Sequence, residues 1–148
     1  DERASLAAHL AEAGDASEVA RRLAPFVRHV AFAPGDILMR QGQPGDDMIF
    51  LERGRVSTVL LETGAAPVHL RTLTPGTLVG EIALVRGGNR TASVIAVTHC
   101  EAVRIDRAGL ARLEVEDPPL AFAVHRMIML QVSEKLVDNT RVVDLALR

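Results

Sequence analysis

The chain of 148 residues contains no tryptophan, no tyrosine, one cysteine and one lysine, Lys135. A protein that stacks the bases of single-stranded nucleic acid on aromatic side chains requires a different composition. Because Cys100 is the only cysteine, an internal disulfide is excluded. We expect Cys100 to be a structural thiol in a reducing, cytoplasmic compartment.

Long apolar runs and a strong excess of one charge are also missing. The densest apolar run, Met127–Leu130, is far too short to span a bilayer, and the formal net charge is −2. We therefore expect no nucleic-acid partner and no membrane insertion by this segment. No basic-then-apolar leader is present, so we expect no secretory signal, and the start at Asp1 instead of a methionine suggests an excised domain or a processed fragment.

The signatures of common enzyme sites are absent as well. A metal site of the cupin type needs paired histidines, whereas the five histidines of this chain are isolated. There is no Gly-x-Ser-x-Gly elbow and no Walker-type Gly-Lys-Ser/Thr. Glu81 alone does not supply the metal or base of a phosphodiesterase. We predict no catalytic activity, no bound metal and no cofactor. The histidines are His9, His29, His69, His99 and His125.

What the chain does contain is a change of hydrophobic period along its length. Residues 5–30 have helical spacing, interrupted at Gly14-Asp15, with a possible restart at Ser17. From 29 to 106 the period is two, with glycine turns about every ten residues, and Arg53-Gly54-Arg55 is a candidate hairpin turn. The expected strands are Val30–Phe32, Ile37–Met39, Met48–Leu51, Val56–Leu60, Val68–Leu70, Ser93–Val97 and Ala102–Ile105.

After Ile105 the helical period returns. Asp106 is a good N-cap, and Asp117 with the following prolines ends one helix and opens a second, from 118 to about 139. Apolar residues cover more than one face of this second helix. It can pack on its own domain only, or also pair with a second copy in a homodimer through 118–139. Residues 141–148 are expected to be a frayed end or a linker.

The stretch 76–96 stands out because a helical segment, Gly80 to Val85, interrupts the β region. A glycine before a short helix exposes backbone N–H groups to an anion, and Arg90 offers a charged fork suited to phosphate. Glu81 would repel a phosphate, so it is better suited to accept hydrogen bonds from sugar hydroxyls. These two receptors indicate a small sugar phosphate or a nucleotide.

Gly80-Glu81-Ile82-Ala83-Leu84, five residues and then Arg90-Thr91-Ala92 resembles the phosphate-binding cassette of cyclic nucleotide-binding domains. This is the family of the catabolite activator protein and of the regulatory subunits of cAMP-dependent kinase. The resemblance implies a single, mainly β domain with flanking helices: an eight-stranded β-roll, or jelly roll, with an inserted phosphate-binding helix. Its parts would be N-terminal helices (1–30), a β-roll (29–106) with the cassette (76–96), and a C-terminal helix pair (107–148).

The resemblance also assigns ligand contacts, which we state as expectations. Glu81 would accept the ribose 2′-hydroxyl, and Arg90, an uncompensated charge without its anion, would bind the cyclic phosphate. Thr91 could reach a syn purine, which leaves cAMP and cGMP open and, by similarity to bacterial members, favours cAMP. Lys135 and Leu136 are candidates for base contacts. The expected ligand-binding residues are Gly80, Glu81, Ile82, Ala83, Arg90, Thr91 and Ala92.

The function implied is a cyclic nucleotide sensor that moves its C-terminal helices to control an attached or partner protein. Two alternatives stay open: a structural domain of a transporter that no longer binds nucleotide, and the effector domain of a truncated transcription regulator. The absence of a helix-turn-helix after the long helix favours control of an attached protein. Residues 70–77, 116–120 and His125-Arg126 also resemble the domains appended to bacterial SulP-type anion permeases, which implies a position at the inner face of a membrane.

Overall fold

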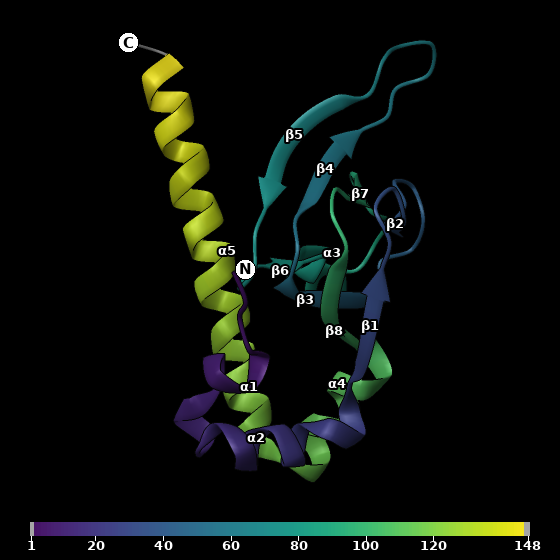
Figure 1. Ribbon diagram of the computed structural model, residues 1–148. Coiled ribbons are helices and arrows are strands. Elements are labelled where there is room, and N and C mark those ends of the chain that lie inside the picture. Colours follow the sequence, from purple (N-terminus) through teal and green to yellow (C-terminus); the bar gives the residue numbers. More distant parts are fainter. Residues whose placement is uncertain (1, 147–148) are drawn as a thin grey trace.

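The computed structural model describes residues 2–146, with 138–146 as backbone only. It confirms a mainly β fold in which two four-stranded antiparallel sheets form a jelly roll with helices at both ends of the chain (Figure 1). The strands are β1 Arg28–Phe32, β2 Ile37–Met39, β3 Asp47–Arg53, β4 Val56–Leu60, β5 Val68–Leu73, β6 Leu78–Val79, β7 Ser93–Ala96 and β8 Cys100–Asp106.

The helices lie at the two ends of the sequence, apart from one short helix inside the β region. The long C-terminal helix α5 runs past the β-roll as a separate column in Figure 1. The helices are α1 Leu6–His9, η1 Ala11–Ala13, α2 Ala16–Leu23, η2 Ala24–Phe26, α3 Glu81–Arg86, α4 Arg107–Glu116 and α5 Pro118–Ala146.

Strand β3 joins the two halves of the hydrophobic core. The strand orders are β1-β8-β3-β6 and β2-β7-β4-β5, so β3 lies inside the first sheet. Met48 and Phe50 belong to the cluster formed with the helices, whereas Ile49 and Leu51 belong to the cluster between the sheets. Because successive side chains of a strand point to opposite faces, one strand can supply both clusters. All four side chains are buried.

Four expectations about element boundaries are wrong. The N-terminal helices end at Phe26 and not at residue 30, because β1 starts at Arg28 and pairs with β8. The restart of the helix is capped by Asp15, which accepts from the Glu18 N–H at 2.9 Å, and not by Ser17. Gly54 makes no hairpin, since β3 and β4 belong to different sheets.

The fourth error concerns the last helix, which continues to Ala146 instead of ending near residue 139. The segment expected to fray, 141–148, is therefore helical as far as Ala146, and residues 147–148 lie outside the described part. An eighth strand, β6, is formed by the apolar pair before the cassette, Leu78 and Val79. It pairs with β3.

The residue between α4 and α5, Asp117, forms an ion pair with Arg22 of the N-terminal helix α2. Asp117 caps α5 by accepting from the Leu120 N–H, and both of its carboxylate oxygens accept from Arg22 at 2.8 and 2.7 Å. Arg22 also donates to the carbonyl oxygen of Ala13 at 2.6 Å. The hydrogen bonds from Arg22 lower the pKa of Asp117. The start of α5 is therefore linked to helix α2 as well as to α4.

Candidate functional site

The cassette begins where β6 turns into α3, and this turn requires glycine. Gly80 is the N-cap of α3 with φ of 83°, a left-handed conformation that other residues rarely adopt. A Cβ at Gly80 would lie 2.5 Å from Nη1 of Arg90 and 2.7 Å from Sδ of Met39. Gly80 therefore allows both the turn and the close approach of the Arg90 guanidinium.

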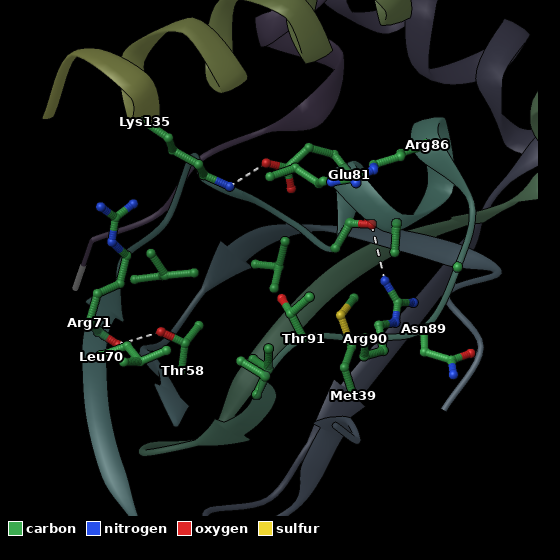
Figure 2. Close-up of a pocket in the computed structure, with 18 of the residues that line it drawn as sticks. Met39, Thr58, Leu70, Arg71, Glu81, Arg86, Asn89, Arg90, Thr91 and Lys135 are labelled. Atoms are coloured by element: carbon green, nitrogen blue, oxygen red, sulfur yellow. Dashed lines mark hydrogen bonds and ion pairs between the residues drawn. The ribbon is translucent and has the colours of Figure 1, made fainter. Parts of the chain in front are cut away.

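An open cavity of about 480 Å³ lies against α3 and the loop that follows it (Figure 2). It brings together all seven residues that the sequence indicates as ligand-binding: Gly80, Glu81, Ile82, Ala83, Arg90, Thr91 and Ala92. Lys135 of α5 also lines it, but Leu136 is not among the lining residues. The size is in the range of pockets for small organic ligands. What each residue does there stays a prediction.

Arg90 is 8% exposed, and its charge is already compensated within the protein. Nη1 donates to the carbonyl oxygen of Gly80 at 3.0 Å, and Nη2 donates to the carbonyl and to a carboxylate oxygen of Asp47 at 2.8 and 2.5 Å. The expectation of an uncompensated arginine is therefore wrong, because β3 supplies a carboxylate. Three of the five guanidinium N–H groups are used, so two remain for an incoming acceptor.

Asp47 is shared between two arginines. Its second carboxylate oxygen forms an ion pair with Nε of Arg104, which lies in β8 beside β3. The carboxylate is mostly shielded from solvent, as is Arg90, whereas the Arg104 side chain is about half exposed. Two guanidinium groups and one carboxylate carry a net charge of +1. A monoanionic phosphate would neutralise this cluster.

Glu81, which the sequence predicts to accept a sugar hydroxyl, is held by the C-terminal helix. Glu81 is 1% exposed, and its Oε1 accepts from Nζ of Lys135 at 2.5 Å, a contact drawn in Figure 2. Lys135 also donates to the carbonyl oxygen of Leu78 at 2.8 Å. One turn earlier, the Gln131 amide donates to the carbonyl oxygen of Gly76 at 2.8 Å. Helix α5 is thus fastened to the strand that leads into the cassette.

The far wall of the cavity consists of residues that the sequence did not indicate. Leu70 and Arg71 of β5 and Thr58 of β4 line the side opposite Arg90 (Figure 2). The Thr58 hydroxyl donates to the carbonyl oxygen of Arg71 at 3.2 Å. An alternating strand pattern cannot tell which of its polar positions faces a ligand, and no motif marks these positions.

The charges of this wall add to those of the cassette. The charged side chains that line the described cavity are Arg71, Arg86, Arg90, Lys135 and Glu81, four cations and one carboxylate. Their sum is +3, although the whole chain has a formal net charge of −2. Positive charge is concentrated where the cassette lies, and the cavity is electrostatically suited to an anion.

A comparison with family models identifies the family of the chain. Residues 29–117, more than half of the chain, match the model of the cyclic nucleotide-binding domain. The chain belongs to this family. The cyclic nucleotide-binding domain is related to the catabolite activator protein and to the regulatory subunits of cAMP-dependent kinase, as the sequence indicated.

Individual relatives share the domain but are much longer. The chain is 29% identical over 132 residues to the cGMP-dependent protein kinase, isozyme 1, of Drosophila melanogaster, covering 84% of the chain and 17% of the kinase. It is 42% identical over 74 residues to the human potassium/sodium hyperpolarization-activated cyclic nucleotide-gated channel 3, covering 50% of the chain and 9% of the channel. The chain thus spans less than a fifth of either relative.

A solved structure supports the fold. A cyclic nucleotide-binding domain from Methylobacillus flagellatus KT superposes with a TM-score of 0.80 at 20% identity, covering 93% of this chain and 83% of that one. In the part of the chain described here, no helix is both long and apolar enough to cross a membrane. Nor do the described side chains include a group of histidine, cysteine or acidic residues arranged to hold a metal ion.

The shared carboxylate of Asp47 leads to a testable prediction. In Asp47→Asn, Arg90 loses its anionic partner but keeps a hydrogen-bond acceptor, so the free protein should lose about 1–3 kcal/mol of stability. Because an anion in the cavity would pair again with Arg90, a cyclic nucleotide should raise the melting temperature of the variant more than that of the wild type.

Thermal unfolding with and without nucleotide measures both effects. Asp46→Asn is the matched control, since it removes the same charge from an exposed neighbouring residue. An unchanged melting temperature of free Asp47→Asn would show that the carboxylate does not compensate Arg90.

Proposed function

We propose that this chain is the cyclic nucleotide-sensing domain of a larger protein and that it binds cAMP or cGMP in the cavity beside α3. The observation that carries the proposal is the cavity with a net charge of +3, in which the seven indicated residues meet. We assign it no catalytic role. Binding would be a signal, as the family membership and the relatives' names support.

In this proposal the two receptors bind different parts of one ligand. The phosphate pairs with the free N–H groups of Arg90 and with backbone N–H groups around Ala83, Thr91 and Ala92. The ribose 2′-hydroxyl donates to Glu81. Since Lys135 occupies Oε1 of Glu81, the sugar uses the other oxygen of the same carboxylate. Ile82, half exposed at the cavity, contributes apolar contact.

Sharing Glu81 gives the ligand a way to act on α5. The bond to Lys135 orients the Glu81 carboxylate before the sugar binds. A bound sugar would in turn hold the carboxylate in the orientation that accepts from Lys135. By linkage, nucleotide binding and docking of α5 should therefore strengthen each other. The position of α5 is the output that an attached or partner protein would sense.

The far wall bears on the choice of base. Arg71 lines this wall, and arginine pairs best with the two acceptors O6 and N7 of guanine, whereas adenine has an amino donor in place of O6. We infer that cGMP binds more tightly than cAMP. This order differs from the one that the sequence favoured, because the position of Arg71 in the cavity could not be recognised from the strand pattern.

The proposed binding site does not identify the attached or partner protein that the domain controls. The relatives named above combine the domain with a kinase or a channel. The attachment to an anion permease at the inner face of a membrane rests on the sequence resemblance alone and stays a prediction. The two alternative functions, a scaffold that binds no nucleotide and the effector domain of a transcription regulator, differ from our proposal in ligand response or in output.

Replacing the central arginine tests the binding site directly. In Arg90→Ala the phosphate loses its charged partner, and affinity should fall by about 2–5 kcal/mol, or roughly 30- to 5,000-fold. Titration calorimetry with cAMP, cGMP and 5′-AMP measures this. The control is Arg112→Ala, since Arg112 lies over the Phe26 ring and outside the cavity. No thermal shift of the wild type with millimolar cyclic nucleotide would favour the scaffold alternative.

The base preference gives a second test. A bidentate arginine contact discriminates between bases by about 1–3 kcal/mol, so cGMP should bind about 5- to 150-fold more tightly than cAMP. Arg71→Met should bring the two affinities together. Arg86→Met, which also removes a charge from the cavity, should weaken both ligands alike. Equal affinities in the wild type, or tighter binding of cAMP, would contradict the role of Arg71.

Helix α5 also offers a surface for a second copy of the chain, in line with the homodimer that the sequence left open. Phe122, Met129 and Leu136 are 69%, 64% and 61% exposed and recur every seven residues. A stripe with this period on a long helix is suited to pair with the same stripe of an identical helix. We infer a homodimer through α5.

Met129→Glu would place like charges opposite each other across such a dimer. We expect a dimeric wild type and a monomeric variant in sedimentation equilibrium, with unchanged circular dichroism. The control is Val115→Glu, at an 81% exposed residue of α4 outside the stripe, which should stay dimeric. A monomeric wild type at all concentrations would exclude the dimer.

A further inference from the structure

Arg107 is the first residue of α4, and its side chain reaches back to the cassette. Nη1 donates to the carbonyl oxygen of Leu84 at 2.8 Å, and Nη2 donates to the carbonyl oxygen of Gly45 at 3.2 Å. A longer contact of 3.5 Å joins Nη2 to the carbonyl oxygen of Ala83. One side chain therefore touches the helix of the cassette and the loop between β2 and β3.

The contacts with α3 satisfy the end of that helix. The last four carbonyl groups of a helix have no partner within it, and they carry partial negative charge. The Gly87 N–H donates to the carbonyl oxygen of Ala83 at 2.8 Å, and Arg107 supplies the partner of Leu84. A guanidinium group at this end stabilises the short helix and holds it in place.

The contacts with the loop lead to the phosphate receptor. The backbone N–H of Arg107 donates to the carbonyl oxygen of Asp46 at 2.8 Å, and the next residue, Asp47, binds Arg90. The loop also lies directly on α3, since a Cβ at Gly45 would be 2.2 Å from Cβ of Ala83. The cassette helix, the loop and the start of α4 thus meet at Arg107.

We propose that Arg107 is a positioning residue that transmits a displacement of α3 to α4 and α5. The inference rests on the proposed function, in which nucleotide binding moves or tightens the cassette. A shift of α3 either breaks the bonds of Arg107 or carries the start of α4 with it. Because only Asp117 separates α4 from α5, a shift of α4 changes the point at which α5 begins.

Hydrogen exchange in the intact chain, read by mass spectrometry, measures the response of α3 and the response of α4 and α5 separately. In the wild type, cGMP or cAMP should slow exchange in peptides of α3 and also in peptides of α4 and α5. In Arg107→Met, which keeps the aliphatic stem, α3 should still respond while the response of α4 and α5 is lost. Affinity should fall at least about fivefold, the lower end of typical coupling between sites.

Arg112→Met is the matched control, since this arginine of α4 donates to the carbonyl oxygen of Pro25 and lies over the Phe26 ring. It should keep the full response. Arg107→Lys keeps a donor but not the fork and should give an intermediate response. Arg107 is exposed, so Arg107→Met and Arg107→Lys should both fold, which circular dichroism checks.

The outcomes distinguish this inference from the proposed function. If nucleotide protects α3 and α5 equally in Arg107→Met and Arg112→Met, Arg107 does not transmit the signal, and nucleotide sensing stands. If nucleotide leaves exchange of the wild type unchanged throughout, the proposed function fails, and the inference fails with it.

Discussion

The ion pair between Arg90 and Asp47 is the contact on which the site depends. A guanidinium group cannot lose its charge in a protein, and burying it without a partner is strongly unfavourable. Here β3 supplies Asp47, and β8 adds Arg104 to the same carboxylate. The cluster keeps Arg90 in place at the cavity and still carries one unit of positive charge. It is therefore preorganised for an anion.

The same region explains how one ligand could affect the far end of the chain. Helix α3 and its N-cap Gly80 are held by three side chains: Arg90 from the end of the cassette itself, Lys135 and Arg107. Each of them joins the cassette to another element, namely β3, α5 or α4. A bound nucleotide would change the balance among these contacts. Their small number makes each contribution measurable by single substitutions.

The sequence alone indicated most of the fold and one side of the cavity. Gly80, Glu81 and Arg90 are close in the chain, and their chemistry is tied to a local turn and a short helix, so spacing was sufficient to find them. Strand positions followed from the period of two. The errors lie where tertiary pairing overrides local pattern: residues 28–30 follow a helical spacing but pair with β8, and Gly54 connects two sheets instead of closing a hairpin.

Composition and motif by themselves determined the class of fold and the family, and they predicted that the stretch from 76 to 96 binds an anion. Only the tertiary structure decided which residues compensate the charge of Arg90, which residue binds Glu81, and which residues line the rest of the cavity. Asp47 lies 43 residues from Arg90, and Lys135 lies 54 residues from Glu81. Such pairs follow from strand order and helix packing, and no local pattern encodes them. For this reason the cassette was visible in the sequence, while its partners and the wall formed by Arg71 were not.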